Sequence, residues 1–239
     1  MSYWTALQVV RQAAGELGLP LPTVVTGSTD IQAIQLLSLL NSAGNELMLY
    51  YPWEQFRKEW VLPTVDGQSE YDLPDDYNYL VDQTQWDGTN HWPLLGPKSS
   101  QEWAYLKNAL VAALPRLRYR IVGNKLVLFP TPDAVYSLSF EYVRKYWVDP
   151  AVGADTDMIT ADADYLLYNP WLLVKFIKFK LFELKGLPTA GPSTDFMRVF
   201  NSLTGKDVGA SVLSLSPQTT SQFIGAQSIP DGSWNVFGT

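Results

Sequence analysis

The hydrophobic period of this chain changes twice along its length, and this pattern constrains the fold more than any other feature. Apolar residues recur three and four apart over residues 3–17 and 30–51 and again after Asn169, whereas apolar and polar residues alternate in much of the stretch from Trp53 to about residue 148. The first spacing buries one face of a helix, and the alternation buries one face of a strand. The sequence therefore predicts an α+β fold, with a β-rich insertion at about 55–148 between helical ends.

The helical segments are predicted to form a helical bundle of long helices that carries the insertion as a small antiparallel β-sheet. In the third helical segment, Asn169 stands as an N-cap and Pro170 as the first helical residue. We predict that residues 1–205 form a single domain. Residues 206–239 are predicted to form an extended C-terminal arm, because they show no hydrophobic period and carry one charge beyond Asp207. The predicted helices span about 3–17, 30–51, 163–186 and 192–204.

Local signals predict turns and a short helix inside the β-rich insertion. The dipeptide Asp66-Gly67 lies between two extended runs and predicts a hairpin. Ser99 and Glu102 have the spacing of a capping box, so we predict a short helix that runs up to Pro115.

The clearest hairpin signal is the Gly-Asn dipeptide at 123–124. A two-residue turn at this place sets the register of the two strands, and the alternating segment after it is predicted to add a third antiparallel strand. The register predicted in this way pairs Arg118 with Phe129 and Arg120 with Val127.

The residue composition excludes most catalytic and metal-binding chemistry. The chain has no cysteine and one histidine, His91, so disulfides, thiolate nucleophiles, zinc–cysteine sites and histidine-pair metal motifs are ruled out. Neither a GxGxxG sequence nor Walker spacing occurs. A formal charge of −7 argues against a free-standing nucleic-acid binder. We expect no cofactor, no bound metal ion and no catalytic residue.

Four aspartates lie close together, as in a calcium-binding loop, but their spacing does not match the ligand positions of such a loop. Ile159 stands at the third ligand position, and Thr160 stands where the loop needs glycine. We therefore interpret this stretch as a solvated acidic loop that leads into the next helix. The four residues are Asp155, Asp157, Asp162 and Asp164.

Paired carboxylates are the one catalytic class that the composition permits, because glycoside hydrolysis needs only two acids held about 5–10 Å apart. The chain has 24 acidic residues, so such a pair is easily available. None of them stands in a context that marks a buried acid beside an exposed one. A carboxylate-based peptidoglycan hydrolase stays an alternative function. The acids considered are Glu46, Glu54, Glu59, Glu70, Asp72, Asp75 and Asp76.

Two clusters of basic and apolar residues predict contact surfaces between subunits. Three arginines share one face of a predicted strand and mix with apolar side chains, although an ordinary sheet face with Glu141 as partner is the alternative. The helix after Asn169 is apolar on more sides than one sheet can cover, which leaves subunit contact and core burial both open. The candidate subunit-interface residues are Lys175, Lys178, Phe179, Phe182, Arg116, Arg118 and Arg120.

The order of these elements resembles the head-to-tail adaptor proteins of short-tailed bacteriophages. The matching features are the segment TVDGQSEYDLP, the strand FEYVRKYW with the acidic loop after it, and a closing helical segment with a long C-terminal arm. They span residues 3–205. The resemblance implies a structural virion protein without catalysis. Such a protein forms a ring, usually of twelve copies, which binds beneath the portal and presents its other face to the tail nozzle.

The resemblance also implies further partners and a location. DNA would pass through the ring without sequence-specific binding, and a net negative chain would repel its phosphates. The protein would be made in the host bacterial cytoplasm and would lie at the head–tail junction of the virion, away from any membrane. Another tail or nozzle component is the alternative. The arm would reach the portal or a neighbouring subunit through Phe223, Ile224, Trp234 and Phe237.

Overall fold

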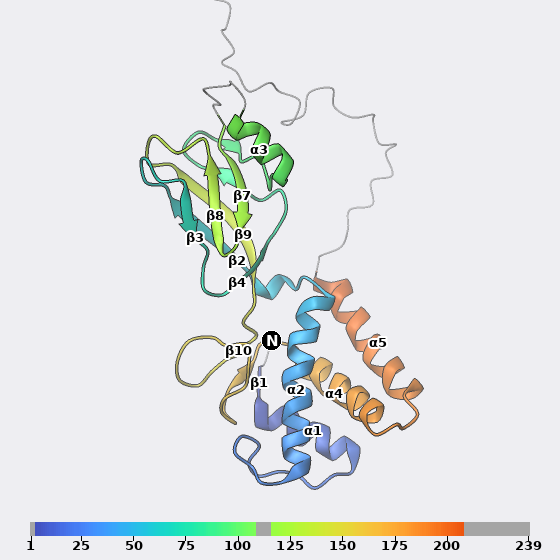
Figure 1. The fold of residues 1–239 in the computed structure, drawn as a ribbon. Helices are drawn as coiled ribbons and strands as arrows, with labels where there is room; N and C mark the ends of the chain where they lie inside the picture. The colour runs from blue at the N-terminus through green and yellow to red at the C-terminus, as the bar shows by residue number, and fades with distance from the viewer. Residues whose placement is uncertain (1–2, 109–115, 208–239) are drawn as a thin grey trace, which may run out of the picture. The chain divides into compact units, whose positions relative to one another are not determined.

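A computed structural model describes residues 3–108 and 116–207 of the chain. Contacts divide the described residues into two units (Figure 1). The first, here called the helical unit, comprises residues 3–57 and 144–207. The second, called the sandwich unit, comprises residues 58–108 and 116–143. The predicted domain of residues 1–205 therefore spans both units, and the helical unit continues to residue 207, two residues beyond the predicted boundary.

The prediction of a bundle of long helices is wrong. Within the described residues the structure has five α-helices and eleven strands, and the strands form three antiparallel sheets. The β part is a unit with its own core, and a further small sheet lies in the helical unit. Several of these strands are two residues long, and such short strands have no hydrophobic period that a sequence could display.

Four helices form most of the helical unit, and α4 lies against the other three (Figure 1). Each of three helices begins at a side-chain cap: Thr5 makes a capping box with Gln8, and Asp30 and Asn169 accept backbone N–H groups of the first turn. The helices are α1 (Ala6–Leu17), α2 (Ile31–Tyr50), α4 (Pro170–Leu184) and α5 (Ala190–Asp207), with a short 3₁₀ helix, η1, at Glu54–Phe56.

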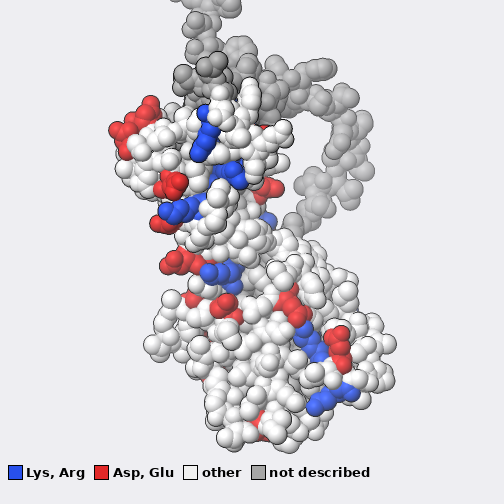
Figure 2. Space-filling model, viewed as in Figure 1, with Lys and Arg blue, Asp and Glu red and all other residues white. Residues whose placement is uncertain are grey.

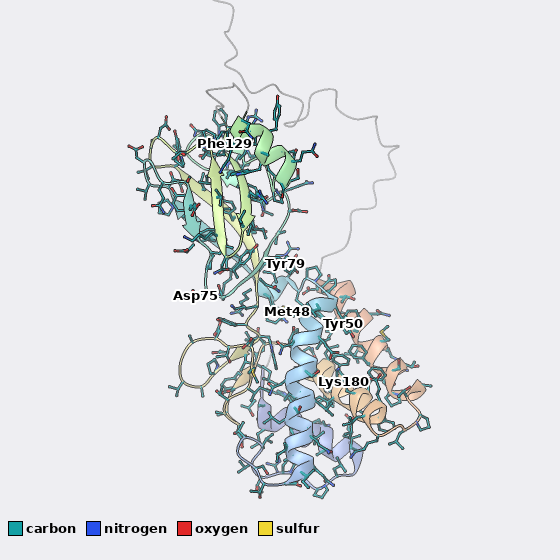
Figure 3. The ribbon with its side chains drawn as sticks, in the orientation of Figure 1. Met48, Tyr50, Asp75, Tyr79, Phe129 and Lys180 are labelled. Carbon is teal, nitrogen blue, oxygen red and sulfur yellow. The ribbon has the colours of Figure 1, made fainter. Side chains whose placement is uncertain are left out.

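The apolar character of α4 is explained by its burial among α1, α2 and α5. Lys180 of α4 reaches Glu46 of α2, and its ammonium group lies 5.0 Å from the centre of the Phe176 ring (Figure 3). Seven residues of this helix are buried: Pro170, Leu172, Leu173, Val174, Phe176, Ile177 and Leu181.

A three-stranded sheet in the order β1-β11-β10 completes the helical unit. The predicted helix from about residue 163 begins later than expected, because Tyr165–Leu166 form β11 and Pro170 is the first helical residue. β11 pairs on one side with β1 (Trp4–Thr5) and on the other with β10 (Val148–Asp149), both antiparallel.

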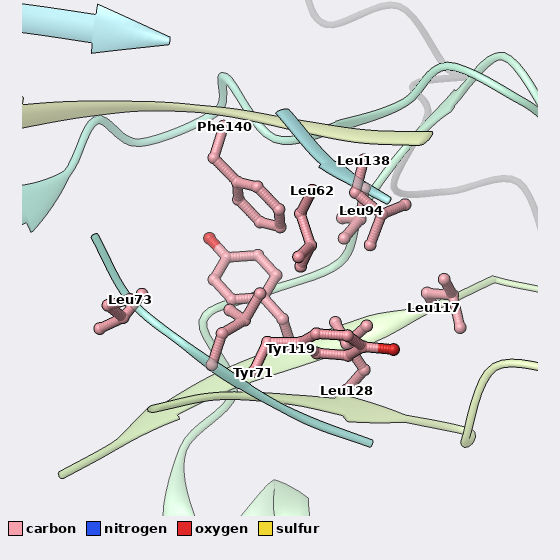
Figure 4. Close-up of a cluster of buried hydrophobic side chains, with 10 residues drawn as sticks. Leu62, Tyr71, Leu73, Leu94, Leu117, Tyr119, Leu128, Leu138 and Phe140 are labelled. Atoms are coloured by element: carbon pink, nitrogen blue, oxygen red, sulfur yellow. The ribbon is translucent and has the colours of Figure 1, made fainter. Parts of the chain in front are cut away.

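Two sheets face each other in the sandwich unit. The first has the order β2-β9-β5-β6, with β4 also paired to β9, and the second has the order β3-β8-β7. Side chains from both sheets meet in one core, in which Tyr119, Leu126, Leu138 and Phe140 are fully buried (Figure 4). The strands are β2 (Arg57–Pro63), β3 (Glu70–Asp72), β4 (Tyr77–Leu80), β5 (Trp86–Asp87), β6 (Trp92–Pro93), β7 (Arg118–Val122), β8 (Lys125–Phe129) and β9 (Ser137–Arg144).

The hairpin at 123–124 is confirmed, including the pairing of Arg118 with Phe129 and of Arg120 with Val127. The expectation that the next strand joins it is wrong, because β9 lies in the other sheet.

The predicted hairpin at Asp66-Gly67 is also wrong. The turn exists, but it leads from β2 in one sheet to β3 in the other. The hydroxyl of Tyr71 holds this turn by accepting from the backbone N–H of Val65 and donating to the backbone oxygen of Gln68. The strands separate because Leu62 of β2 and Tyr71 of β3 both enter the core, from opposite sheets.

The capping box of Ser99 and Glu102 is confirmed by two hydrogen bonds, each from a backbone N–H to the other residue's side chain. It starts α3 (Ser100–Asn108). The remainder of the predicted helix, up to Pro115, lies outside the described residues.

Candidate interaction surfaces

The lysines predicted for a subunit interface tie α4 to α1. The ammonium group of Lys175 lies 2.7 Å from a carboxylate oxygen of Glu16, and that of Lys178 lies 3.6 Å from the same oxygen. Burial alone would raise the pKa of Glu16, but its hydrogen bond and charge interactions with these lysines outweigh burial and lower that pKa. Both lysines thus have a partner inside the chain.

The two phenylalanines of α4 lie at different places. Phe179 lies beside the stacked rings of Phe176 and Phe196, nearly parallel to both, and its ring centre is 6.3 Å from each of theirs. Phe182 is half-buried and lines a pocket of about 230 Å³ together with Leu36 and Leu187. Phe179 therefore contributes to the α4–α5 contact, whereas Phe182 borders an open apolar pocket.

The three arginines lie together in the sandwich unit, so they belong to a different unit from the α4 residues. The guanidinium of Arg116 lies 5.8 Å from the centre of the Trp92 ring. Arg118 is buried, and Arg120 donates to the hydroxyl of Ser100 at 2.8 Å. The four arm residues Phe223, Ile224, Trp234 and Phe237 lie outside the described residues.

The aspartates of the acidic loop act as clamps on the backbone. Asp162 accepts hydrogen bonds from the backbone N–H groups of Val25 and Thr26, and Asp164, which is 1% exposed, accepts from those of Thr160 and Ala161. Burial alone would raise the pKa of both carboxyl groups, but these hydrogen bonds hold the pKa of each below its ordinary value. In the described part of the chain no group of acidic side chains is arranged to hold a metal ion.

We expect the helical unit to lose stability in acid because of these clamps. A carboxyl group whose pKa is lower in the folded than in the unfolded chain stabilises the fold above its unfolded pKa, and that contribution is lost as the pH falls through the folded pKa. Asp164→Asn should therefore lower the free energy of unfolding by about 2 kcal/mol at pH 7 and flatten its decline below about pH 4.

Urea denaturation at a series of pH values measures this effect. Asp157→Asn, at an exposed position of the same loop, is the matched control and should leave the curve unchanged. If the free energy of unfolding of Asp164→Asn ran parallel to that of the wild type at every pH, the proposed stabilisation by the ionised Asp164 carboxylate would be contradicted.

The hydrolase alternative receives no support from the carboxyl groups. A general acid needs a raised pKa. Among the described acids, each one whose pKa departs from its ordinary value has a lowered pKa. His91 is exposed at the tip between β5 and β6, with a backbone φ of 60°.

An open groove lies beside α1 in the helical unit, and the sequence analysis did not predict it. Its volume is about 860 Å³. Exposed aromatic side chains border it, and Trp4 packs on the half-exposed Trp171 with ring centres 5.5 Å apart. We call it the α1 groove; its lining residues are Tyr3, Trp4, Thr5, Gln8, Arg11, Gln12, Gly15, Leu21 and Tyr165.

Aromatic and apolar surface of this kind is typical of a protein that works through contacts with other chains. Residues 4–185 match the SU10 adaptor protein family. The match covers more than half of the 239 residues, so the chain belongs to this family of bacteriophage adaptor proteins and is a structural protein of the virion. A comparison with curated proteins found no match. Among the helices of the described residues, none has both the length and the hydropathy needed to cross a bilayer.

Proposed function

We propose that this protein is a ring-forming head-to-tail adaptor that joins the portal to the tail nozzle and lines the DNA channel. The observation that carries the proposal is the exposed aromatic surface around the α1 groove, in a chain that belongs to an adaptor family. Half-exposed tryptophan and tyrosine side chains of this kind are enriched where proteins bind one another. Much of the helical unit's visible surface also lacks charged side chains (Figure 2).

The charge of the chain suits a DNA channel. The formal charge is −7 and the pI is about 4.7. A ring of such chains, with about twelve copies as in the adaptors that the sequence resembles, would repel the phosphates of a passing duplex. DNA would then slide without sequence-specific binding. The ring would occupy the head–tail junction.

Residues 206–239 supply the proposed contact with the portal or with a neighbouring copy. This segment carries one charge beyond Asp207, and its aromatic residues are Phe223, Trp234 and Phe237. Bound to a partner, such a segment loses conformational entropy that its apolar anchors must offset.

Removing residues 208–239 is expected to abolish binding to portal rings while the helical and sandwich units stay folded. The quadruple variant F223A/I224A/W234A/F237A should weaken binding by at least about 100-fold, because aromatic anchors dominate interface energies. Sedimentation velocity of the chain mixed with portal rings of the same virus measures the bound copies. Circular dichroism of each variant is the folding control. Normal portal binding by the truncated chain would contradict the role of the arm.

A further inference from the structure

We propose that the α1 groove of one copy binds the loop of residues 150–158 from a neighbouring copy. The proposal rests on the ring function above and names the contact that closes the ring.

The α1 groove offers a positive charge inside an aromatic rim. Arg11 is its one charged lining residue, and no acidic residue lines it. Arg11 is exposed, and within the described residues no ion pair involves its guanidinium. Tyr3, Leu21 and Tyr165 expose 41%, 56% and 46% of their surface around it. An occupant that fits must bring an apolar side chain and at least one carboxylate.

The 150–158 loop has this chemistry. Val152 at its tip is 93% exposed, the highest fraction among the exposed large hydrophobic residues described. Asp149 and Asp157 flank the tip and are exposed, and neither forms an ion pair with another described residue. Asp155, by contrast, is engaged by Arg144. The loop therefore presents an apolar side chain and the carboxylate of Asp157, and the carboxylate of Asp149 lies at the end of β10, just before the loop.

The base of the loop is held in place. Val148 and Thr156 exchange two backbone hydrogen bonds of 3.0 Å each, and the hydroxyl of Thr156 donates to the backbone oxygen of Met158 at 2.7 Å. Gly153, with a φ of 112°, allows the reversal at the tip. Figure 1 shows the loop projecting beside β10. A loop ordered in this way loses little entropy when it docks.

The groove and the loop lie at opposite edges of one sheet. In the order β1-β11-β10, the groove includes the β1 edge and Tyr165 of the central strand, whereas the loop leaves from β10, where Asp149 is the cross-strand partner of Tyr165. The high exposure of Val152 shows that the chain's own loop does not occupy its own groove. A contact between two different edges of the same unit is heterologous, and heterologous contacts repeat from copy to copy into a ring or an open helix.

Chemical cross-linking tests this contact directly, because the chain has no cysteine of its own. Leu21→Cys places a thiol in the groove, and Val152→Cys places one at the loop tip. A mixture of the two single variants, treated with a short bismaleimide, should give a cross-linked dimer, and the double variant should give a ladder of multimers. The matched control pairs Val152→Cys with Ser202→Cys, an exposed position on α5 outside the groove, and should give at most one-tenth of that yield.

Charge reversal then tests the proposed pairing. Arg11→Glu should lower the cross-linking yield at least about tenfold, because like charges would meet at the contact. Adding Asp149→Lys and Asp157→Lys should restore most of the yield. High salt should lower the wild-type yield. A yield that Arg11→Glu leaves unchanged would overturn the pairing.

Cross-linking and portal binding are separate readouts, so the two proposals can fail separately. Each cross-linking reaction is run on the free chain and on the chain mixed with portal rings. Copies that co-sediment with the portal without a 21–152 cross-link would overturn the groove contact and leave the adaptor function standing. A specific cross-link without portal binding would support the groove contact and count against the adaptor function. Absence of the cross-link in both preparations overturns the groove contact, including the case in which another protein occupies the groove.

Discussion

Replacing Phe196 with alanine is expected to remove about 4 kcal/mol from the free energy of unfolding of the helical unit. Phe196 is the one buried residue of α5. Its ring lies 4.4 Å from that of Phe176 on α4, with the planes 16° apart, and Phe200 packs 5.8 Å away. The loss combines the transfer energy of an aromatic side chain with the cavity that remains. α5 should then separate from α4 before the rest of the unit unfolds.

Urea denaturation gives the energy, and amide hydrogen exchange along α5 shows whether that helix opens first. Met197→Ala is the matched control, since Met197 is the next residue and is 52% exposed. It should change stability by less than about 0.5 kcal/mol. A Phe196→Ala variant as stable as Met197→Ala would show that α5 is held by something other than this aromatic stack.

Gly44→Ala is expected to destabilise the same unit by about 3 kcal/mol, although alanine is the better helix former. A Cβ atom at Gly44 would lie 2.3 Å from the ring carbon Cζ2 of Trp147, which is fully buried. That ring cannot move easily, because its N–H donates to the side-chain oxygen of Asn45 at 3.1 Å. The backbone oxygen of Gly44 also accepts from the hydroxyl of Tyr168 at 3.1 Å.

Gly191→Ala in α5 separates helix propensity from packing. A Cβ atom at Gly191 meets nothing within 4 Å, so this variant should be neutral or more stable by up to about 1 kcal/mol. Both variants are measured by urea denaturation under identical conditions. Equal stability changes of the same sign would disprove the close contact between α2 and Trp147.

Features encoded over three to five residues were predictable from the sequence. The cap at Asn169, the capping box of Ser99 and Glu102, and the turn at 123–124 with its register all occur as expected. In each case, one side chain or one dipeptide satisfies nearby backbone groups or sets the local φ angles, so the signal does not depend on the rest of the fold.

Contact surfaces were harder to predict than local turns. The sequence pattern predicted Lys175 and Lys178 to lie at a subunit contact. In the structure both lysines pair with Glu16, which is more than 150 residues away in the sequence. The α1 groove gave no sequence signal at all. Its rim joins residues near the N-terminus to Tyr165 on a strand of two residues, and neither segment has a period that marks it as a surface.

The sequence by itself determined the cap residue Asn169, the capping box of Ser99 and Glu102, the position of the tightest turn, and which metal and thiol chemistries its residue types exclude. Only the tertiary structure decided that β2 and β3, and likewise β8 and β9, belong to different sheets. The physical reason is that alternation records which face of a strand is buried and does not record the partner that buries it. Leu62, Tyr71 and Phe140 each lie on the buried face of an alternating strand. They fill a single core, but Leu62 and Phe140 enter it from one sheet and Tyr71 enters it from the other.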